Sequence, residues 1–553
     1  MGVFRYFRYL LNTYKGQFYE CMNKESQFAV DMLLIDCNAI FHPACREIFF
    51  PENVSILRKK PSYEELEAKA FKNVTDKLEE LIRMCPPRKL LYLAIDGVAG
   101  MCKQSQQRKR RYKTAKDRKQ LGTEADDVFD TCNISAGTPF MERLSKYMQD
   151  WIVRIKQYPY RTLQIIFDGM HVVSEGEHKL VKYLYNPKNC NYKSTYCIVS
   201  PDADLIFLAM CIPHGRGYIL RENIYTDITG KFLLVDCYKL KGCISDSINW
   251  NERTYGSLGH SLCTKEAIEE KQVILNDYDI RKAVKDYILF LFLVGNDFLP
   301  CMYAFDISND GIEILQNCYT SAASTKGYLS DVKNNMCYEP FLQLFDQLSQ
   351  KEEYMLTVKS TKTCKNPDSL LKSCVGKDDV GKLKLDFSIL RRQYYERKFG
   401  QFSEEFVEEV SKAYLRGLHF VLTYYTIAIP SYAWFYEYHY APFAIDIYNT
   451  IKKMELWEWN KIQEWEYKPP LTLKQSLMGV IPPSSYKVLP EEIQSTMLKH
   501  KDDPLFSEEF EVDLEGKQQD YEGICLLPNV TYTQLKRFVK DKWEDVKCPI
   551  LYK

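Results

Sequence analysis

Short apolar runs that stop at an aspartate recur along this sequence, and they constrain its fold more than any other feature. The runs cover residues 32–35, 90–95 and 196–199, and they lead to Asp36, to Asp96 and to the pair Asp202 and Asp204. An unbroken apolar run bounded by a polar residue is typical of a buried parallel strand. Because the carboxyl ends of parallel strands meet at one edge of an open sheet, we expect these carboxylates to gather there.

Helical patterns alternate with these strands. Residues 1 to about 20, 63–84 and 139–157 carry apolar side chains at helical spacing, whereas residues 163–167 and 217–221 predict further strands. The alternation predicts an α/β fold with a doubly wound, largely parallel central sheet flanked by helices.

The chain of 553 residues is too long for a single hydrophobic core. We divide it into a core of residues 1–321, a connecting segment of Lys-rich stretches and short helices at 322–402, and a second, mostly helical block at 403–553 that packs on the core. Within the first part, residues 240–275 are polar and predict an inserted loop, and residues 279–295 predict a strongly apolar helix.

Two further acidic segments belong with the strand-end aspartates, one where a loop turns into a helix and one in a turn behind an apolar run. An isolated Asp at a strand end is ordinarily a helix cap, but seven carboxylates on one edge would repel one another unless cations lay among them. Hard oxygen ligands select Mg²⁺ over zinc, and Mn²⁺ would substitute for it. We therefore predict two Mg²⁺ ions roughly 3.5–4 Å apart, an arrangement suited to phosphodiester cleavage. The predicted metal ligands and catalytic residues are Asp36, Asp96, Glu175, Glu177, Asp202, Asp204 and Asp297.

The most basic stretch of the sequence begins shortly after Asp96. On a helix, Lys103, Gln107, Arg110 and Arg111 share one face. A run of charge is usually a solvated helix face, but the position of this run points its first turns toward the predicted metals. Since a guanidinium group is a planar fork of donors, we predict that the four side chains bind a terminal phosphate.

Three other side chains are candidates for substrate binding. Asn38 and His42 follow Asp36, and Trp434 lies in a block rich in aromatic residues. A lone His is more often structural, but the neighbourhood of His42 favours stacking of its ring on a nucleobase. Trp434 suits ordinary core packing and base stacking equally well.

The bulk composition excludes several classes of protein. The net charge is zero, so any nucleic-acid site must come from local segregation of charge. The 19 cysteines contain no C-x-x-C pair, which argues against a zinc ribbon and favours a reducing, intracellular setting. The longest apolar stretch, residues 418–435, contains His419 and Pro430 and is a poor membrane span. We expect a soluble, cytoplasmic monomer without a membrane partner, although the basic run would also suit a nuclear import signal.

Ten short segments together resemble the Xrn-type 5′→3′ exoribonucleases across most of the chain. They are residues 34–42, 94–99, 106–111, 175–179, 202–205, 295–300, 430–434, 438–443, 477–480 and 526–528. The resemblance implies a PIN/FEN-like nuclease core in which the seven acids bind the catalytic metals and the basic helix face holds a 5′-monophosphate. It also implies that His42 and Trp434 stack on the first bases, so that single-stranded RNA is degraded processively to nucleoside 5′-monophosphates. A pocket sized for a monophosphate would exclude a capped end, so the RNA would come from decapping machinery, as in mRNA decay.

The sequence departs from the family pattern at three places. Val173-Ser174 replaces a usual Pro-Gly, Cys301 replaces a usual His, and Tyr432 replaces a common Trp. None of these is a predicted metal ligand, so they bear on loop geometry and processivity. The short connecting segment and the end of the chain after the second block are typical of a compact member, as from a large DNA virus or a protist.

Two other functions fit parts of this pattern. A flap-type, structure-specific DNA nuclease would use a similar carboxylate cluster, and a preference for the 2′-hydroxyl would separate it from an RNA enzyme. A nucleic-acid-binding scaffold without activity would keep the fold, but no acid of the set is missing.

Overall fold

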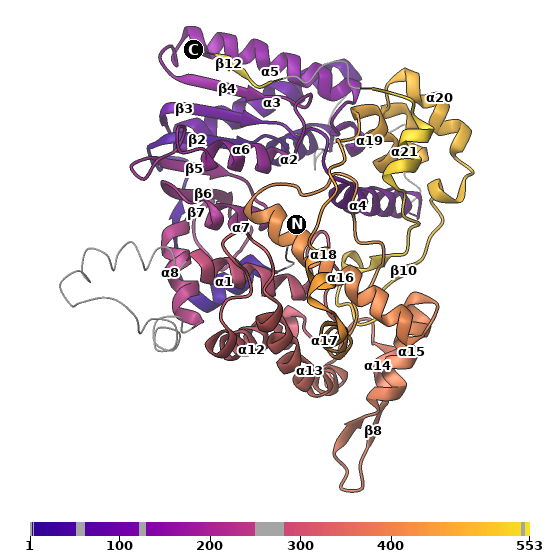
Figure 1. Ribbon diagram of the computed structural model, residues 1–553. Coiled ribbons are helices and arrows are strands. Elements are labelled where there is room, and N and C mark those ends of the chain that lie inside the picture. The colour runs from indigo at the N-terminus through magenta and orange to yellow at the C-terminus, as the bar shows by residue number, and fades with distance from the viewer. Residues whose placement is uncertain are drawn as a thin grey trace, which may run out of the picture.

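An eight-stranded sheet forms the centre of the N-terminal part, and helices cover both of its faces (Figure 1). The computed structural model describes residues 3, 5–50, 61–120, 129–248, 281–542 and 548–552. In spatial order the strands are β1 (Tyr19–Met22), β7 (Phe232–Asp236), β6 (Arg216–Glu222), β5 (Thr195–Val199), β2 (Val30–Asp36), β3 (Pro87–Ala94), β4 (Gln164–Asp168) and β12 (Ile550–Tyr552). The five strands from β6 to β4 are mutually parallel, and β7, β1 and β12 each pair antiparallel with the strand before them at their edge of the sheet. The predicted doubly wound, largely parallel sheet is confirmed.

The strand order reverses at β2. Strands β3 and β4 follow on one side of it and β5 and β6 on the other, with Leu34 of β2 in register with Tyr92 of β3 and Ile198 of β5. In open α/β sheets, ligands bind in the crevice beyond the carboxyl ends of the strands at such a reversal. The fold therefore places a binding crevice where β2, β3 and β5 end.

Alternate residues of β2 enter different cores, because successive side chains of a strand point to opposite faces. Leu33 and Ile35 pack with α2 (Asn38–Phe49), α3 (Tyr63–Met84) and α5 (Pro139–Gln157). Leu34 packs on the other face, among residues of α1 (Tyr6–Tyr14), α6 (Gly176–Tyr185), α7 (Asp204–Cys211) and α8 (Cys237–Ser247). The ranges predicted for α3 and α5 match the structure, and those for β4 and β6 agree to within a residue or two at each end.

Three predicted elements need correction. The first helix ends at Tyr14, because Lys15 and Gly16 have φ angles of 29° and 82°, and the chain then turns into β1 instead of continuing to residue 20. The expected loop at 240–275 begins with a helix, α8, whose N-terminus is capped by Asp236; residues 249–280 lie outside the described ranges. The apolar helix at 279–295 is helical over 281–291, continues as a 3₁₀ turn, and stops before Gly295 at φ 88°.

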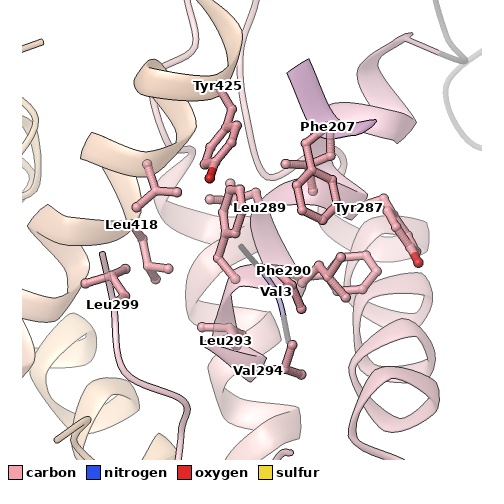
Figure 2. Packing of buried hydrophobic residues seen from close by; sticks show 14 of the residues in the cluster. Val3, Phe207, Tyr287, Leu289, Phe290, Leu293, Val294, Leu299, Leu418 and Tyr425 are labelled. Carbon is pink, nitrogen blue, oxygen red and sulfur yellow. The ribbon is translucent and has the colours of Figure 1, made fainter. Parts of the chain in front are cut away.

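A helical region, from α12 to α18, packs on the face of the sheet that α6 and α7 cover. It contains α12 (Gly311–Lys326), α13 (Tyr338–Thr361), α14 (Ser369–Ser373), α15 (Phe387–Phe399), α16 (Glu404–Thr426), α17 (Ala444–Lys453) and α18 (Leu456–Lys461). The segment expected to hold only short helices thus includes α13, which has 24 residues. One continuous core joins α12 to α17 with the α6–α7 face of the sheet, and Figure 2 shows Tyr425 of α16 near Phe207 of α7. The boundaries at 321 and 402 stay a prediction.

The C-terminal part surrounds helix α4 (Met101–Gln120). Helices α19 (Leu473–Val480), α20 (Glu491–His500) and α21 (Tyr532–Phe538) form a third core with Met101 of α4 (Figure 1). The last strand, β12, then pairs with β4 at the edge of the sheet. Within the described ranges, no helix is long and apolar enough to cross a membrane.

Candidate active site

The acidic residues at and just beyond the ends of β2 and β3 meet at the carboxyl edge of the sheet, and Asn38 links them. Asp36 is the last residue of β2, and its Oδ1 accepts a hydrogen bond from the Asn38 amide at 3.2 Å. The Oδ1 of Asn38 accepts one from the Asp96 amide at 3.0 Å. Asn38, predicted to bind substrate, therefore holds the two acid-bearing turns at a fixed spacing.

Gly176 brings the loop before α6 against both of these aspartates. Its amide donates to Oδ1 of Asp96 at 2.6 Å, and a Cβ at this position would lie 2.9 Å from Oδ1 of Asp36. A side chain at residue 176 would therefore push into the carboxylates. The absence of a side chain allows Glu175 and Glu177, on either side of this glycine, to reach the edge of the sheet.

Ser174 adopts a backbone conformation that favours glycine. Its φ is 107°, and its main chain is held from both sides: its carbonyl accepts from the Gly97 amide at 2.8 Å, and its amide donates to the Val98 carbonyl at 3.1 Å. This is the position where the sequence has Val-Ser in place of Pro-Gly. Ser174 therefore holds this conformation at the cost of local backbone strain.

Lys103, in the first turn of α4, lies among the acids. Its Nζ is 3.3 Å from Oε2 of Glu175 and 3.0 Å from Oδ2 of Asp297. Burial raises the pKa of Asp297, but nearby positive charges, the Lys103 ammonium first among them, together lower it further and leave that pKa at about 2. The lysine thus neutralises part of a carboxylate cluster that would otherwise repel itself.

Two of the acids have buried oxygen atoms without a donor. Neither oxygen of Asp204, nor Oε1 of Glu177, has a hydrogen-bond partner among the described residues. Burial, followed by the Asp297 charge, raises the pKa of Asp204 to about 7, and burial also raises the pKa of Glu177 well above its usual range. Burial, with the charges of Asp96 and Asp202, does the same for Asp36.

The raised pKa values are those expected where buried carboxylates lie close together without enough positive charge among them. Buried carboxylate oxygens without donors are the chemistry that Mg²⁺ requires, so the donor set fits the ion. Within the described ranges, however, no group of three or more acidic, His or Cys side chains is arranged to hold an ion as it stands. Lys103 is the cationic group that contacts Glu175 and Asp297 here.

The sequence reasoning missed a tyrosine pair that reaches this cluster from α16. The Tyr424 hydroxyl donates to Oε1 of Glu175 at 2.5 Å. Tyr425 is buried beside Asp204, and its pKa is raised by burial and by the charges of Asp204 and Asp297. The pair lies in the aromatic part of the sequence, but nothing local indicates that hydroxyls from this helix meet acids some 250 residues away.

A second residue that the sequence reasoning missed is Lys179, which contacts the segments next to the acid cluster. The Nζ of Lys179 donates to the carbonyls of Ile95 and Gly169 at 2.7 and 2.9 Å and lies 3.1 Å from Oδ1 of Asp168. The buried lysine thereby ties α6 to the ends of β3 and β4. Its position four residues after Glu175, on the same helix face, was the available signal.

The basic side chains of helix α4 lie on two faces with different surroundings. Gln107 and Arg111 are half-buried and Arg110 is exposed on the face that begins with Lys103. Nη1 of Arg111 is buried without a hydrogen-bond partner in the described part of the chain. On the opposite face, buried Arg108 donates to the Tyr112 hydroxyl and to the carbonyls of Gly479 and Leu505, so the run is not a solvated face.

His42 and Trp434 have different surroundings. His42, on α2, is exposed, yet desolvation by nearby protein and the Arg110 and Arg111 charges lower its pKa to about 4. It therefore stands beside the basic face as a neutral ring. Trp434 is half-buried and stacks on Phe420 with ring centroids 4.3 Å apart, so one of its faces belongs to the core.

A carboxylate cluster beside a basic helix, at the carboxyl edge of a doubly wound sheet, is the arrangement of an α/β nuclease. Comparison with known families agrees with this class. Residues 1–223 match the XRN 5′-3′ exonuclease N-terminus, and residues 277–374 and 355–544 match the Xrn1 helical domain. The chain therefore belongs to the XRN 5′-3′ exonuclease family, a family of hydrolases.

Curated relatives align with nearly the whole chain. The human protein named 5′-3′ exoribonuclease 1 is 26% identical over 97% of this chain, and an Arabidopsis thaliana 5′-3′ exoribonuclease 2 is 27% identical over 97%. A 5′-3′ exoribonuclease 2 from Debaryomyces hansenii is 25% identical over 93%. The chain spans 34% of the human relative's length and 66% of the other two.

Proposed function

We propose that the protein is a Mg²⁺-dependent 5′→3′ exoribonuclease that degrades 5′-monophosphorylated single-stranded RNA processively to nucleoside 5′-monophosphates. The observation that carries this proposal is that the basic face of α4 begins inside the acid cluster. Lys103 contacts Glu175 and Asp297, and two turns along the same helix Arg111 has a buried donor without a hydrogen-bond partner among the described residues. In this proposal, the binding site for a terminal phosphate lies next to the site of phosphodiester hydrolysis.

Each group of residues has a role in this proposal. The seven acids would hold two Mg²⁺ ions; the chemistry that the bound ions supply is activation of a water and stabilisation of the leaving oxygen. Arg110, Arg111 and Gln107 would bind the 5′-monophosphate, since a buried guanidinium donor without a partner gains most from a charge-assisted bond. His42 would stack on the first base, because its ring is neutral and exposed beside these arginines.

The test compares one RNA that carries a 5′-monophosphate, a 5′-hydroxyl or a 5′-cap, with Mg²⁺ or with EDTA. We expect rapid loss of the monophosphate form alone, release of nucleoside 5′-monophosphates, and no reaction in EDTA. Asp202→Ala should abolish hydrolysis. Equal cutting of all three ends, internal fragments, or equal cutting of a matched DNA strand would contradict the proposal and favour a structure-specific nuclease; RNA binding without release of nucleotides would favour a scaffold.

A further inference from the structure

Tyr424 contacts two of the acid-bearing segments at once. It is buried near the end of α16, and its ring lies edge-on to His178 and Phe298, with centroids 4.1 and 4.7 Å apart. His178 follows Glu177 on α6, and Phe298 follows Asp297 in the turn after the apolar helix. One side chain of the helical region thus packs against both the Glu177 segment and the Asp297 segment.

The hydroxyl of Tyr424 also fixes one oxygen of Glu175. Oε1 accepts its hydrogen bond at 2.5 Å, while Oε2 lies 3.3 Å from the Lys103 ammonium, which is itself 3.0 Å from Asp297. Oε2 therefore faces the other acids. A carboxylate with one oxygen held by a buried donor keeps one orientation, so the other oxygen is presented at a fixed place.

We propose that Tyr424 is a positioning residue for the metal site, through which the helical region controls divalent-cation affinity. This inference rests on the proposed function, in which Glu175 is a metal ligand. Tyr424 itself touches neither metal nor substrate. Loss of a group that orients a ligand typically weakens metal binding by about 10–100-fold.

Tyr424→Phe tests the role of the hydroxyl, and Tyr414→Phe is the matched control. Tyr414 lies on the same helix, is fully buried, and donates a hydrogen bond from its hydroxyl to the Pro300 carbonyl at 3.0 Å instead of to a carboxylate. Mg²⁺ affinity is measured by calorimetry on the full chain without RNA, together with the thermal midpoint in EDTA. We expect Tyr424→Phe to bind Mg²⁺ about 10–100-fold more weakly and Tyr414→Phe to bind it as the wild type does.

Steady-state kinetics provide a second readout. In Tyr424→Phe, kcat at low Mg²⁺ should fall, high Mg²⁺ should restore it, and KM for 5′-monophosphorylated RNA should not change. Wild-type Mg²⁺ affinity in Tyr424→Phe, or an equal loss in Tyr414→Phe, would overturn the inference while leaving the proposed function intact. Failure of the wild-type protein to bind Mg²⁺ would overturn both.

Discussion

The Lys103 ammonium lies 3.0 Å from Oδ2 of Asp297, and this contact joins two segments that are 194 residues apart in the sequence. Only 13% and 5% of the two side-chain surfaces are exposed, so the pair is inside the protein and weakly screened by water. Removing one partner of a buried ion pair is costly, because it leaves the other charge without compensation.

Lys103→Met should make the protein less stable in a pH-dependent way. The pKa of Asp297 is about 2, below its unfolded value, and Lys103 is the largest cause that lowers it, so this contribution is complete above about pH 4 and is lost as the pH falls toward 2. We expect the variant to be less stable than the wild type by roughly 2 kcal/mol at pH 5 in EDTA, with little difference at pH 2. Chemical denaturation at both pH values measures this gap.

Lys116→Met is the control for this prediction. Lys116 lies on the same helix, but its ammonium donates to the Phe510 carbonyl instead of a carboxylate. Its stability difference from the wild type should not change with pH. A gap for Lys103→Met that is the same at pH 5 and pH 2 would show that the ion pair does not set the pKa of Asp297.

Asp204→Asn should stabilise the protein in EDTA while abolishing hydrolysis. Burial raises the pKa of Asp204 to about 7, so the contribution of this group to stability is greatest below about pH 4 and is lost as the pH rises through 7. The neutral amide removes this loss, by up to about 4 kcal/mol at pH 8. Thermal midpoints should show a larger gain at pH 8 than at pH 5, and Mg²⁺ should stabilise the wild type but not the variant.

Asp286→Asn provides the contrasting case. Burial raises the pKa of Asp286 to about 7 as well, but its oxygens accept from the Leu329 and Ser330 amides and from the Ser330 and Tyr319 hydroxyls. An amide nitrogen in place of one oxygen would face donors, so we expect a loss of about 1–3 kcal/mol. If both variants gain stability, the missing donors at Asp204 are not the cause of its effect.

Ser174→Gly should stabilise the protein. A non-glycine residue at a φ of 107° costs about 1–3 kcal/mol, whereas glycine costs roughly 0.5–1 kcal/mol in backbone entropy, so a net gain of about 1 kcal/mol is expected. Ser174→Ala removes the hydroxyl without relieving the backbone, and its thermal midpoint should not rise. An equal rise in both variants would place the effect in the side chain instead of the backbone.

Arg111→Ala should remove the preference for a 5′-monophosphate. A hydrogen bond to a charged group contributes about 1.5–3 kcal/mol, so kcat/KM for the monophosphorylated RNA should fall by about 10–100-fold, with little change for a 5′-hydroxyl RNA. Arg108→Met is the control: Arg108 binds carbonyls of the C-terminal part on the other face of α4, so it should lower the thermal midpoint without changing the 5′-end preference. The same preference in Arg111→Ala and the wild type would contradict the phosphate assignment.

Local pattern in the sequence was enough to predict the central sheet. An apolar run that ends at Asp36 must be buried along its length and polar at its tip. A parallel strand meets this requirement whichever strands lie next to it. The same holds for α3, where a capping box at Ser62 and Glu65 marks the start of the helix. The end of α1 was not predictable in this way, because it depends on positive φ angles at Lys15 and Gly16. The start of α8 was not predictable either, because this helix directly follows β7, whose place in the sheet depends on pairing with β1.

Strand ends and helix faces recur at fixed periods along the sequence. These periods were enough to nominate the seven acids, the four donors on one face of α4 and His42 as candidates. The contacts among them do not follow from these periods. That Lys103 lies between Glu175 and Asp297, that Tyr424 binds Glu175, and that Arg108 turns away from the site are results of packing between segments far apart in the sequence. Such contacts depend on the whole set of buried neighbours, which local periodicity does not contain, and only the tertiary structure decides them.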